Sequence, residues 1–131
     1  MNKRWQPKNG EWYYYIQASG AIAHTICSAS DFDHNLWLNG NCFVTIEDAI
    51  FERKCHETER LMFDWADKHN EIGLPVYELV YVPANDAVIV DKVIHVRPGI
   101  KFTNPQTAYN VIEYFGEKWL KKYYFRIEQE E

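Results

Sequence analysis

Long apolar runs are absent from this sequence, and cysteine is scarce. No segment reaches the ~18 consecutive apolar residues that a membrane-spanning helix requires. The chain opens on charged residues with no apolar segment after them, so we expect no secretion signal. Its 3 cysteines are odd in number and lack a paired spacing, which indicates reduced thiols. These absences predict an intracellular protein that does not enter a membrane.

Motifs for phosphate binding and nucleophilic catalysis are also missing. The sequence contains neither G-x-x-x-x-G-K-[ST] nor G-x-G-x-x-G, so nothing indicates a glycine-rich loop that cradles a phosphate. Cys42 has no flanking motif of a catalytic nucleophile. Carboxylates are mixed with Lys and Arg along residues 46–70, a pattern typical of a solvated helix face. We therefore expect a protein that is not an enzyme.

The composition is that of a folded chain with a core of ordinary size. Of its 131 residues, 47% are apolar and 16% are aromatic, and the aromatic share exceeds that of disordered chains. The net charge of −5 disfavours strong direct binding of nucleic acid, although it suits a partner with a basic surface. So many aromatic rings predict that some reach the surface, where rings often anchor partners.

One local pattern occurs twice in the chain. Residues 43–49, Phe-Val-Thr-Ile-Glu-Asp-Ala, have the spacing of a helix start, with Thr45 as the N-cap and acids in the first turn. Residues 102–108, Phe-Thr-Asn-Pro-Gln-Thr-Ala, repeat that spacing 59 positions later, with Asn104 as the cap and proline at the first helical position. A strand–turn–strand pattern precedes each copy. The sequence thus predicts two ββα units, at about residues 12–70 and 77–122.

Apolar periodicity places the individual elements. Strands are predicted at residues 12–17, 21–28, 77–82 and 87–96, and helices at 46–70 and 105–115. Residues 29–41 are predicted as a loop or one helical turn, and 117–122 as one more turn.

The predicted fold class is α+β, with residues 1–131 as a single domain. Both hairpins would form one antiparallel sheet of four to five strands, covered by two helices as a two-layer sandwich. The alternative is two lobes, each with a hairpin and a helix. Because a lone hairpin with one helix is a poor stability unit, the single core is favoured.

A zinc site is the main alternative to a chain without cofactors. His24, Cys27, Cys42 and Cys55 could supply the four ligands of a tetrahedral ion. However, no C-x-x-C or H-x-x-x-H spacing is present, and residues three apart on a strand point to opposite faces, so His24 and Cys27 would need a bulge. Buried cysteines behave as small apolar residues. The sequence therefore favours core thiols, with zinc as the alternative.

Three stretches of the chain carry a family resemblance. They are Trp5-Gln6-Pro7-Lys8-Asn9-Gly10-Glu11-Trp12-Tyr13-Tyr14-Tyr15-Ile16, then Gly40-Asn41-Cys42-Phe43-x-Thr45-x-Glu47-x-Ala49, and finally Ile112 to Tyr124. Together they resemble small accessory proteins of phages and prophages in Gram-positive bacteria, over most of the chain. The shared motifs are structural rather than catalytic. Such proteins often sit among counter-defence genes, including inhibitors of CRISPR nucleases, so the resemblance implies a protein that works in the cytoplasm of the bacterial host.

The predicted function is that of a non-enzymatic phage protein that binds and inhibits a host defence protein, such as a CRISPR-associated nuclease. Nucleases hold nucleic acid in channels lined by Lys and Arg, and an acidic helix face can compete for such channels. The candidate contacts are the loop residues Asp31, Phe32, Asp33, His34 and Trp37, and the helix acids Glu52, Glu59, Asp64 and Asp67.

Two other functions stay open. Exposed aromatic side chains could form a symmetric interface between copies, as in a virion or assembly component that associates with itself. The chain could also be a binding protein that zinc stabilises.

Overall fold

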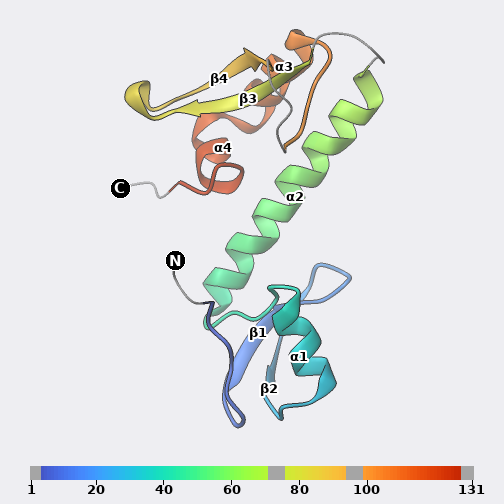
Figure 1. The fold of residues 1–131 in the computed structure, drawn as a ribbon, viewed down its shortest axis with the longest axis vertical. Helices are drawn as coiled ribbons and strands as arrows, with labels where there is room; N and C mark the ends of the chain where they lie inside the picture. Colours follow the sequence, from blue (N-terminus) through green and yellow to red (C-terminus); the bar gives the residue numbers. More distant parts are fainter. Residues whose placement is uncertain (1–3, 71–75, 94–98, 128–131) are drawn as a thin grey trace. The chain divides into compact units, whose positions relative to one another are not determined.

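The computed structural model describes residues 4–70, 76–93 and 99–127, and the chain divides into two compact units, residues 1–54 and 55–131. Unit 1 holds β1 (Trp12–Ile16), β2 (Ile22–Ile26), α1 (Asp31–Leu38) and the first turns of α2 (Ile46–His69) (Figure 1). Unit 2 holds the rest of α2, β3 (Tyr77–Val82), the short 3₁₀ helix η1 (Pro83–Asn85), β4 (Ala87–Lys92), α3 (Pro105–Phe115) and α4 (Glu117–Tyr123). The α+β class is confirmed.

The first hairpin is a regular antiparallel pair. Trp12 lies opposite Ile26 and Ile16 lies opposite Ile22, with Gly20 in the connecting turn at φ 89°. Because side chains alternate along a strand, Tyr13 and Tyr15 lie on one face of the pair. Tyr13 is fully buried, and the ring of Tyr15 meets the ring of Phe32 from α1 edge-on at 5.5 Å.

Helix α1 replaces the predicted loop or single turn at residues 29–41. Ser30 caps it: the Ser30 hydroxyl accepts from Asp33 N–H, and the Asp33 carboxylate accepts from Ser30 N–H. This reciprocal pair is a capping box, which satisfies backbone donors that a helix start leaves without partners. The pattern Ser-x-x-Asp was a local signal for this helix that the prediction passed over.

A third segment lies beside β1 and completes its outer edge. Tyr14 and Phe43 exchange both backbone hydrogen bonds, at 2.9 Å each. One step further, Ile16 N–H donates to Asn41 Oδ1 and Asn41 Nδ2 donates to Ile16 O, each at 2.7 Å. The Asn41 amide therefore supplies the donor and acceptor that a neighbouring strand would supply.

Helix α2 begins and ends close to the prediction. Thr45 Oγ1 accepts from Asp48 N–H at 3.1 Å, which confirms Thr45 as the cap. The helix ends at His69, one residue before the predicted end at 70. Its buried positions follow helical spacing, as predicted for an amphipathic helix. They are Ala49, Cys55, Thr58, Met62 and Ala66.

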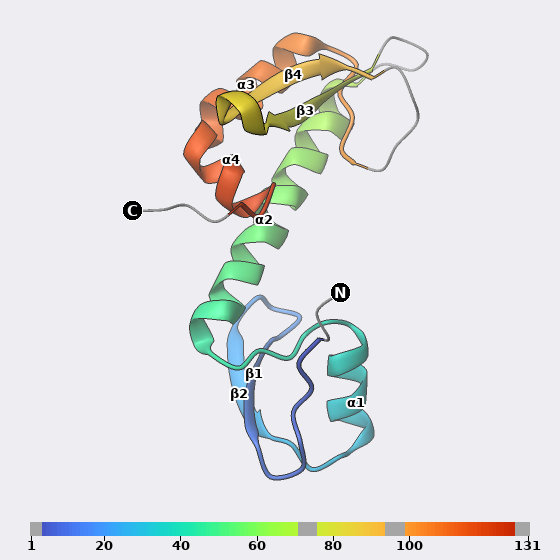
Figure 2. The same ribbon diagram turned by 60° about the vertical axis from the view of Figure 1, so that its left-hand side comes forward.

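Unit 2 is built around a compact apolar core. The hairpin β3–β4 pairs Tyr77 with Lys92 and Val82 with Ala87, and it packs against α3 and α4 (Figure 2). Asn104 caps α3 through its side chain, as predicted, and Gly116 ends the helix at φ 86°. The core residues are Met62, Ala66, Leu79, Val88, Ile100, Phe102, Ala108, Val111 and Leu120. After α4, Tyr124 and Phe125 pack against this core.

The duplicated helix start is confirmed. Phe43 pairs with Tyr14 of the preceding hairpin, and Phe102 pairs with Tyr77 of the second hairpin in the same antiparallel manner. In each copy the helix begins three residues after the phenylalanine. Each unit is thus a hairpin whose first strand gains a short third partner that leads into a helix.

The single sheet of four to five strands is not what the structure shows. The described residues contain two separate two-stranded sheets, one in each unit, and four α-helices rather than two. The physical reason is that β1 and β3 each give an outer-edge position to a segment of their own unit, at Phe43 and Phe102. Each unit has its own hairpin, as in the alternative of two lobes, but with more helical segments than the one per lobe that was expected. The predicted strand at 87–96 ends at Lys92, and 94–98 lie outside the described residues.

Candidate functional site

One face of the β1–β2 hairpin carries apolar and aromatic side chains that are only partly covered. We call it the hairpin face, and its residues are Trp12, Tyr14, Ile16, Ile22, His24 and Ile26. Trp12 is 60% exposed and its cross-strand partner Ile26 is 45% exposed. His24 is also exposed, and its ring lies 5.4 Å from the Trp12 ring and 5.9 Å from the Tyr14 ring. A large exposed apolar group of this kind is typical of an interaction site.

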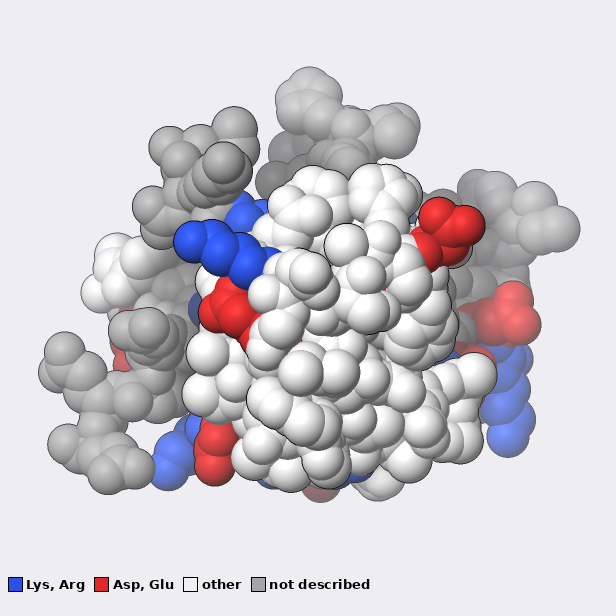
Figure 3. Space-filling view, turned by 90° about the horizontal axis from the view of Figure 1, so that it is seen from below, with Lys and Arg blue, Asp and Glu red and all other residues white. Residues whose placement is uncertain are grey.

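The sequence around the hairpin face is almost free of charge. Between Trp12 and Ile46 the only Asp, Glu, Lys or Arg residues are Asp31 and Asp33, and Asp33 is buried. Figure 3 looks at the chain from below the view of Figure 1, and the surface facing the viewer is uncharged across its middle. Interface cores are poor in charged residues and rich in aromatic ones. The distribution of charge along the sequence could have identified this stretch.

Asp33 is a structural carboxylate. It is 5% exposed, and Oδ1 accepts from the Tyr13 hydroxyl at 2.5 Å. Oδ2 accepts from the backbone and hydroxyl groups of Ser28 and Ser30, at 2.7 to 3.2 Å. The Tyr13 hydrogen bond is the main reason that the pKa of Asp33 lies far below its usual range, against the opposing effect of burial. Burial, followed by the same hydrogen bond, raises the pKa of Tyr13. A buried side chain cannot be a surface contact, so the predicted contact at Asp33 is corrected.

The other predicted loop contacts all lie on α1. Asp31, Phe32 and His34 are exposed. Trp37 is half-buried, with the Arg4 guanidinium 4.4 Å from its ring centre and the His34 ring 6.2 Å away. These residues remain candidates for contact with a partner.

A cavity of about 170 Å³ lies beside α1 in unit 1. Asp33, His34 and Trp37 line it together with the N-terminal segment at Gln6, Pro7 and Asn9 and with Cys27, Ala29 and Ser30. The structure thus brings three of the predicted loop residues together. However, the cavity is smaller than the roughly 300–1,000 Å³ of most small-molecule sites. It therefore gives little reason to expect a cofactor there.

The predicted acids of α2 differ in exposure. Asp64 and Asp67 are exposed, whereas Glu52 and Glu59 are half-buried. Glu52 belongs to unit 1 and the other three belong to unit 2. Asp64 and Asp67 are therefore solvated acidic side chains. Glu59 lines a cavity in unit 2, which is described below.

The four residues proposed as zinc ligands do not form a site. No group of three or more His, Cys, Asp or Glu side chains lies close enough to hold a metal ion in residues 4–70, 76–93 and 99–127. His24 is exposed on the hairpin face, whereas Cys27 is buried with Sγ 3.7 Å from Pro7 O. This divergence is the consequence of strand alternation, and no bulge in β2 reverses it.

Cys42 is half-buried, and the pKa of its thiol is raised. Burial is the first cause that raises its pKa, to about 11, and the negative charge of Asp33 adds to it. The thiolate is the nucleophilic form of cysteine, and a raised pKa keeps that form rare near neutral pH. Cys42 therefore has the chemistry of a structural thiol.

Unit 2 has a larger cavity, of about 450 Å³. It is lined by Glu59, Phe63, Glu78, Leu79, Gly99, Ile100, Tyr124 and Phe125. Glu78, one of these lining residues, is buried, and its Oε2 accepts from Lys101 Nζ at 2.6 Å. Burial is the main reason that the pKa of Tyr124 is raised, so its hydroxyl stays neutral. Paired and neutral groups of this kind suit docking of an apolar side chain better than proton transfer.

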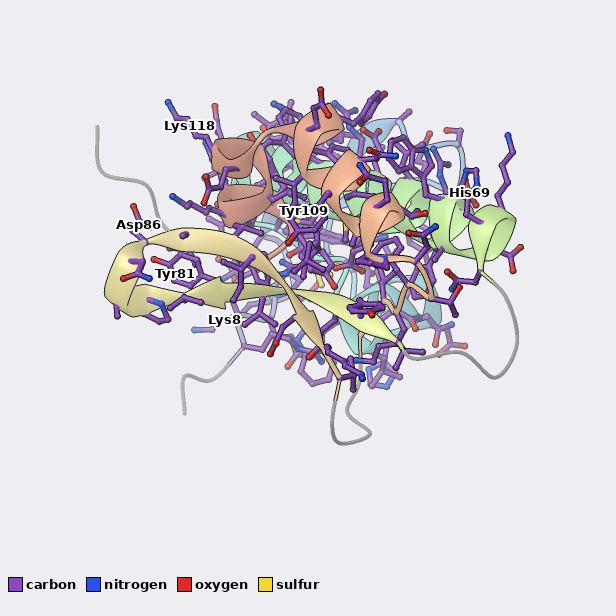
Figure 4. The ribbon with its side chains drawn as sticks, turned by 90° about the horizontal axis from the view of Figure 1, so that it is seen from above. Lys8, His69, Tyr81, Asp86, Tyr109 and Lys118 are labelled. Atoms are coloured by element: carbon purple, nitrogen blue, oxygen red, sulfur yellow. The ribbon has the colours of Figure 1, made fainter. Side chains whose placement is uncertain are left out.

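The tip of the β3–β4 hairpin is held by polar contacts. The Tyr81 hydroxyl donates to Asp86 Oδ1 at 2.8 Å, and Figure 4 shows the two side chains next to each other. Lys121 Nζ from α4 lies 3.4 Å from Asp86 Oδ2. Asp86 has a left-handed backbone at φ 48°, which its short polar side chain tolerates. The first contact lies within the hairpin tip, and the second connects the tip to α4.

Comparisons with known proteins give no relative: no family model matches the chain, no curated protein is similar, and no solved structure matches its fold. Separately, none of the helices in the described residues is both long and apolar enough to cross a membrane.

Proposed function

We propose that the chain is a non-enzymatic protein of a phage or prophage that binds a host defence protein, such as a CRISPR-associated nuclease, and blocks it. The observation that carries the proposal is the hairpin face, where exposed Trp12 lies beside Ile26 and His24 in a stretch with almost no charge. Tryptophan is strongly enriched among the residues that dominate binding energy. The resemblance of three stretches of the sequence to phage accessory proteins is the reason for proposing this source.

The roles of the shared motif residues support binding rather than catalysis. Gly10, at φ 91°, turns the chain so that Glu11 N–H reaches Lys8 O at 2.9 Å. Glu11 Oε1 also accepts from Lys8 N–H at 2.7 Å, which holds this turn just before β1. Asn41 completes the edge of β1. These residues build the scaffold under the hairpin face and leave its side chains for recognition.

The test is complex formation with candidate host nucleases, combined with DNA cleavage by those nucleases. We expect a stable complex and loss of cleavage with the unaltered chain. Trp12→Ala should weaken the complex by about 30-fold or more, the size of a hot-spot loss of about 2 kcal/mol. Tyr114→Ala, which removes a ring that is 64% exposed on α3 in unit 2, is the matched control and should change affinity little. No complex at micromolar concentration would remove this function.

Salt distinguishes the hairpin face from the acidic helix face as the contact. A neutral interface should lose little affinity as salt rises, because screening acts on charges. If Asp64 and Asp67 instead imitate the charge of nucleic acid, the affinity should fall steeply with salt. The double variant Asp64→Asn, Asp67→Asn should then weaken the complex more than Trp12→Ala does. That result would move the contact from the hairpin face to α2.

A further inference from the structure

The outer edge of β2 is an open strand edge. Tyr14 and Ile16 of β1 direct their backbone groups to Phe43 and Asn41, away from β2. In an antiparallel pair, positions alternate between bonded and non-bonded, so the ladder to β2 uses the positions in between. The ladder bonds that flank the strands, Cys27 N–H to Glu11 O and Gln17 N–H to Ala21 O, fit that alternation.

It follows that Ile22, His24 and Ile26 of β2 direct their backbone N–H and C=O groups outward. The first sheet contains only β1 and β2, and none of residues 4–70, 76–93 and 99–127 hydrogen-bonds to those outward groups. An edge of this kind is a template for pairing with another strand.

The corresponding edge in unit 2 is guarded. Tyr77 directs its groups to Phe102, so by the same alternation Val88 of β4 directs its N–H outward. That N–H donates to Glu117 Oε1 at 2.6 Å, and α4 packs against β4. Lys92, at the end of β4, adds a charge of the type that prevents pairing between edges. β2, Ile-Ala-His-Thr-Ile, has no charge, no proline and no covering side chain of this kind in the described residues.

We propose that the β2 edge pairs antiparallel with β2 of a second copy of this chain and so forms a symmetric dimer with a continuous four-stranded sheet. The strand is self-complementary about His24. With a two-fold axis at His24, Ile22 faces Ile26 of the second copy and Ala23 faces Thr25 of the second copy. The positions whose backbone groups point outward are then the positions that meet, so each pair exchanges both of its hydrogen bonds. A self-complementary patch is what a two-fold interface requires.

The second copy is favoured over a foreign peptide by this sequence symmetry and by the absence of charge. Because no like charges oppose one another across the axis, nothing in β2 resists pairing with itself. The dimer would place two hairpin faces side by side on one sheet. It does not rest on the proposed function, because it uses backbone groups of β2 and needs no host protein.

Crosslinking of the full chain tests both the dimer and its register. In this register the two His24 Cα atoms lie about 5.5 Å apart, within the range that a disulfide spans. His24→Cys should therefore form a crosslinked dimer under mild oxidation. The matched control is Ile26→Cys, an exposed position on the same strand. Two copies of residue 26 would lie four positions apart, about 13 Å, so this variant should not crosslink.

The mass in solution gives an independent readout. Light scattering on the unaltered chain should give twice 15.6 kDa at high concentration. His24→Pro removes one outward N–H and spares the ladder to β1, so the dimer should be lost, whereas His24→Thr keeps that N–H and the dimer. Circular dichroism shows whether His24→Pro folds. If it does not fold, crosslinking of His24→Cys and Ile26→Cys decides the question. A chain that stays monomeric would leave the edge to a strand of another protein and overturn the proposal, as would equal crosslinking at positions 24 and 26.

Discussion

At the residue scale, the polar side chains of Asn41 and Asp33 organise unit 1 through hydrogen bonds. The Asn41 amide pairs with both backbone groups of Ile16, as a neighbouring strand would. The Asp33 carboxylate gathers Tyr13, Ser28 and Ser30 into one buried network. Buried polar groups are costly unless they are paired, so both residues are sensitive positions in unit 1.

Asn41→Ala should destabilise unit 1 by about 1–3 kcal/mol, because it leaves the amide and carbonyl of Ile16 without partners in a partly buried place. Urea unfolding measures the change. The control is Asn39→Ala, which removes an exposed hydrogen bond to Asn35 O at the end of α1 and should cost less than about 0.5 kcal/mol. Equal effects at positions 39 and 41 would contradict the role assigned to Asn41.

Tyr13→Phe should change how stability depends on pH. The folded-state pKa of Asp33 is lowered, so the carboxylate stabilises the fold above its ordinary pKa of about 4, and this contribution is lost as pH falls below that value. The Tyr13 hydroxyl is the first cause of the lowering, so without it the contribution is smaller. The difference in unfolding free energy between the unaltered chain and Tyr13→Phe should therefore shrink from pH 7 towards pH 3. Tyr15→Phe, on the same strand face, is the control, and a difference that grows on acidification would contradict this account.

Cys42 should react slowly with iodoacetamide at pH 8. Its pKa is raised to about 11, so only a small fraction of the thiol is the reactive thiolate. Mass spectrometry of alkylated peptides measures the rate, with an unfolded sample in urea as the reference. A rate in the folded chain that equals the rate in urea would show that the raised pKa is wrong.

At the element scale, the helix starts were predictable and the sheet edges were not. Thr45 and Asn104 cap helices through groups within three residues, so the signal is local in sequence. The pairing of Asn41 with Ile16 spans 25 residues, and that of Glu117 with Val88 spans 29. No local pattern in the sequence announces such contacts, which occupy the outer edge of β1 and part of the outer edge of β4. The hairpin face was also missed, although the near absence of charge between residues 12 and 46 was readable.

The two helix caps should have similar energetic weight, because they are copies of one local device. We expect Thr45→Ala and Asn104→Ala each to cost about 1 kcal/mol of unfolding free energy. Gln17→Ala, an exposed position in the first hairpin turn, should change stability little. If one cap variant leaves the unfolding free energy unchanged while the other lowers it strongly, the two helix starts would be alike in geometry but not in energy.

At the scale of the whole molecule, the feature that carries the proposal is exposed apolar surface. The described residues contain no metal-binding cluster. The thiol of Cys42, the one cysteine of the three that is only half-buried, has a raised pKa. What the chain exposes instead is aromatic and aliphatic surface, with Trp12 and Ile26 on a neutral stretch and charged side chains concentrated elsewhere in the sequence. The proposed function would use this exposed surface, so the place of binding is the central question.

Amide hydrogen exchange of the chain, with and without a host nuclease that it binds, answers that question most directly. Because a bound partner covers the hairpin face, we predict slower exchange in peptides that contain residues 12–16 and 22–26, and unchanged exchange in peptides from α3. Both samples contain the same concentration of the chain, so that a difference in chain concentration does not change how much of it is dimeric. Slower exchange confined to residues 55–69 of α2, with the hairpin unchanged, would contradict the account.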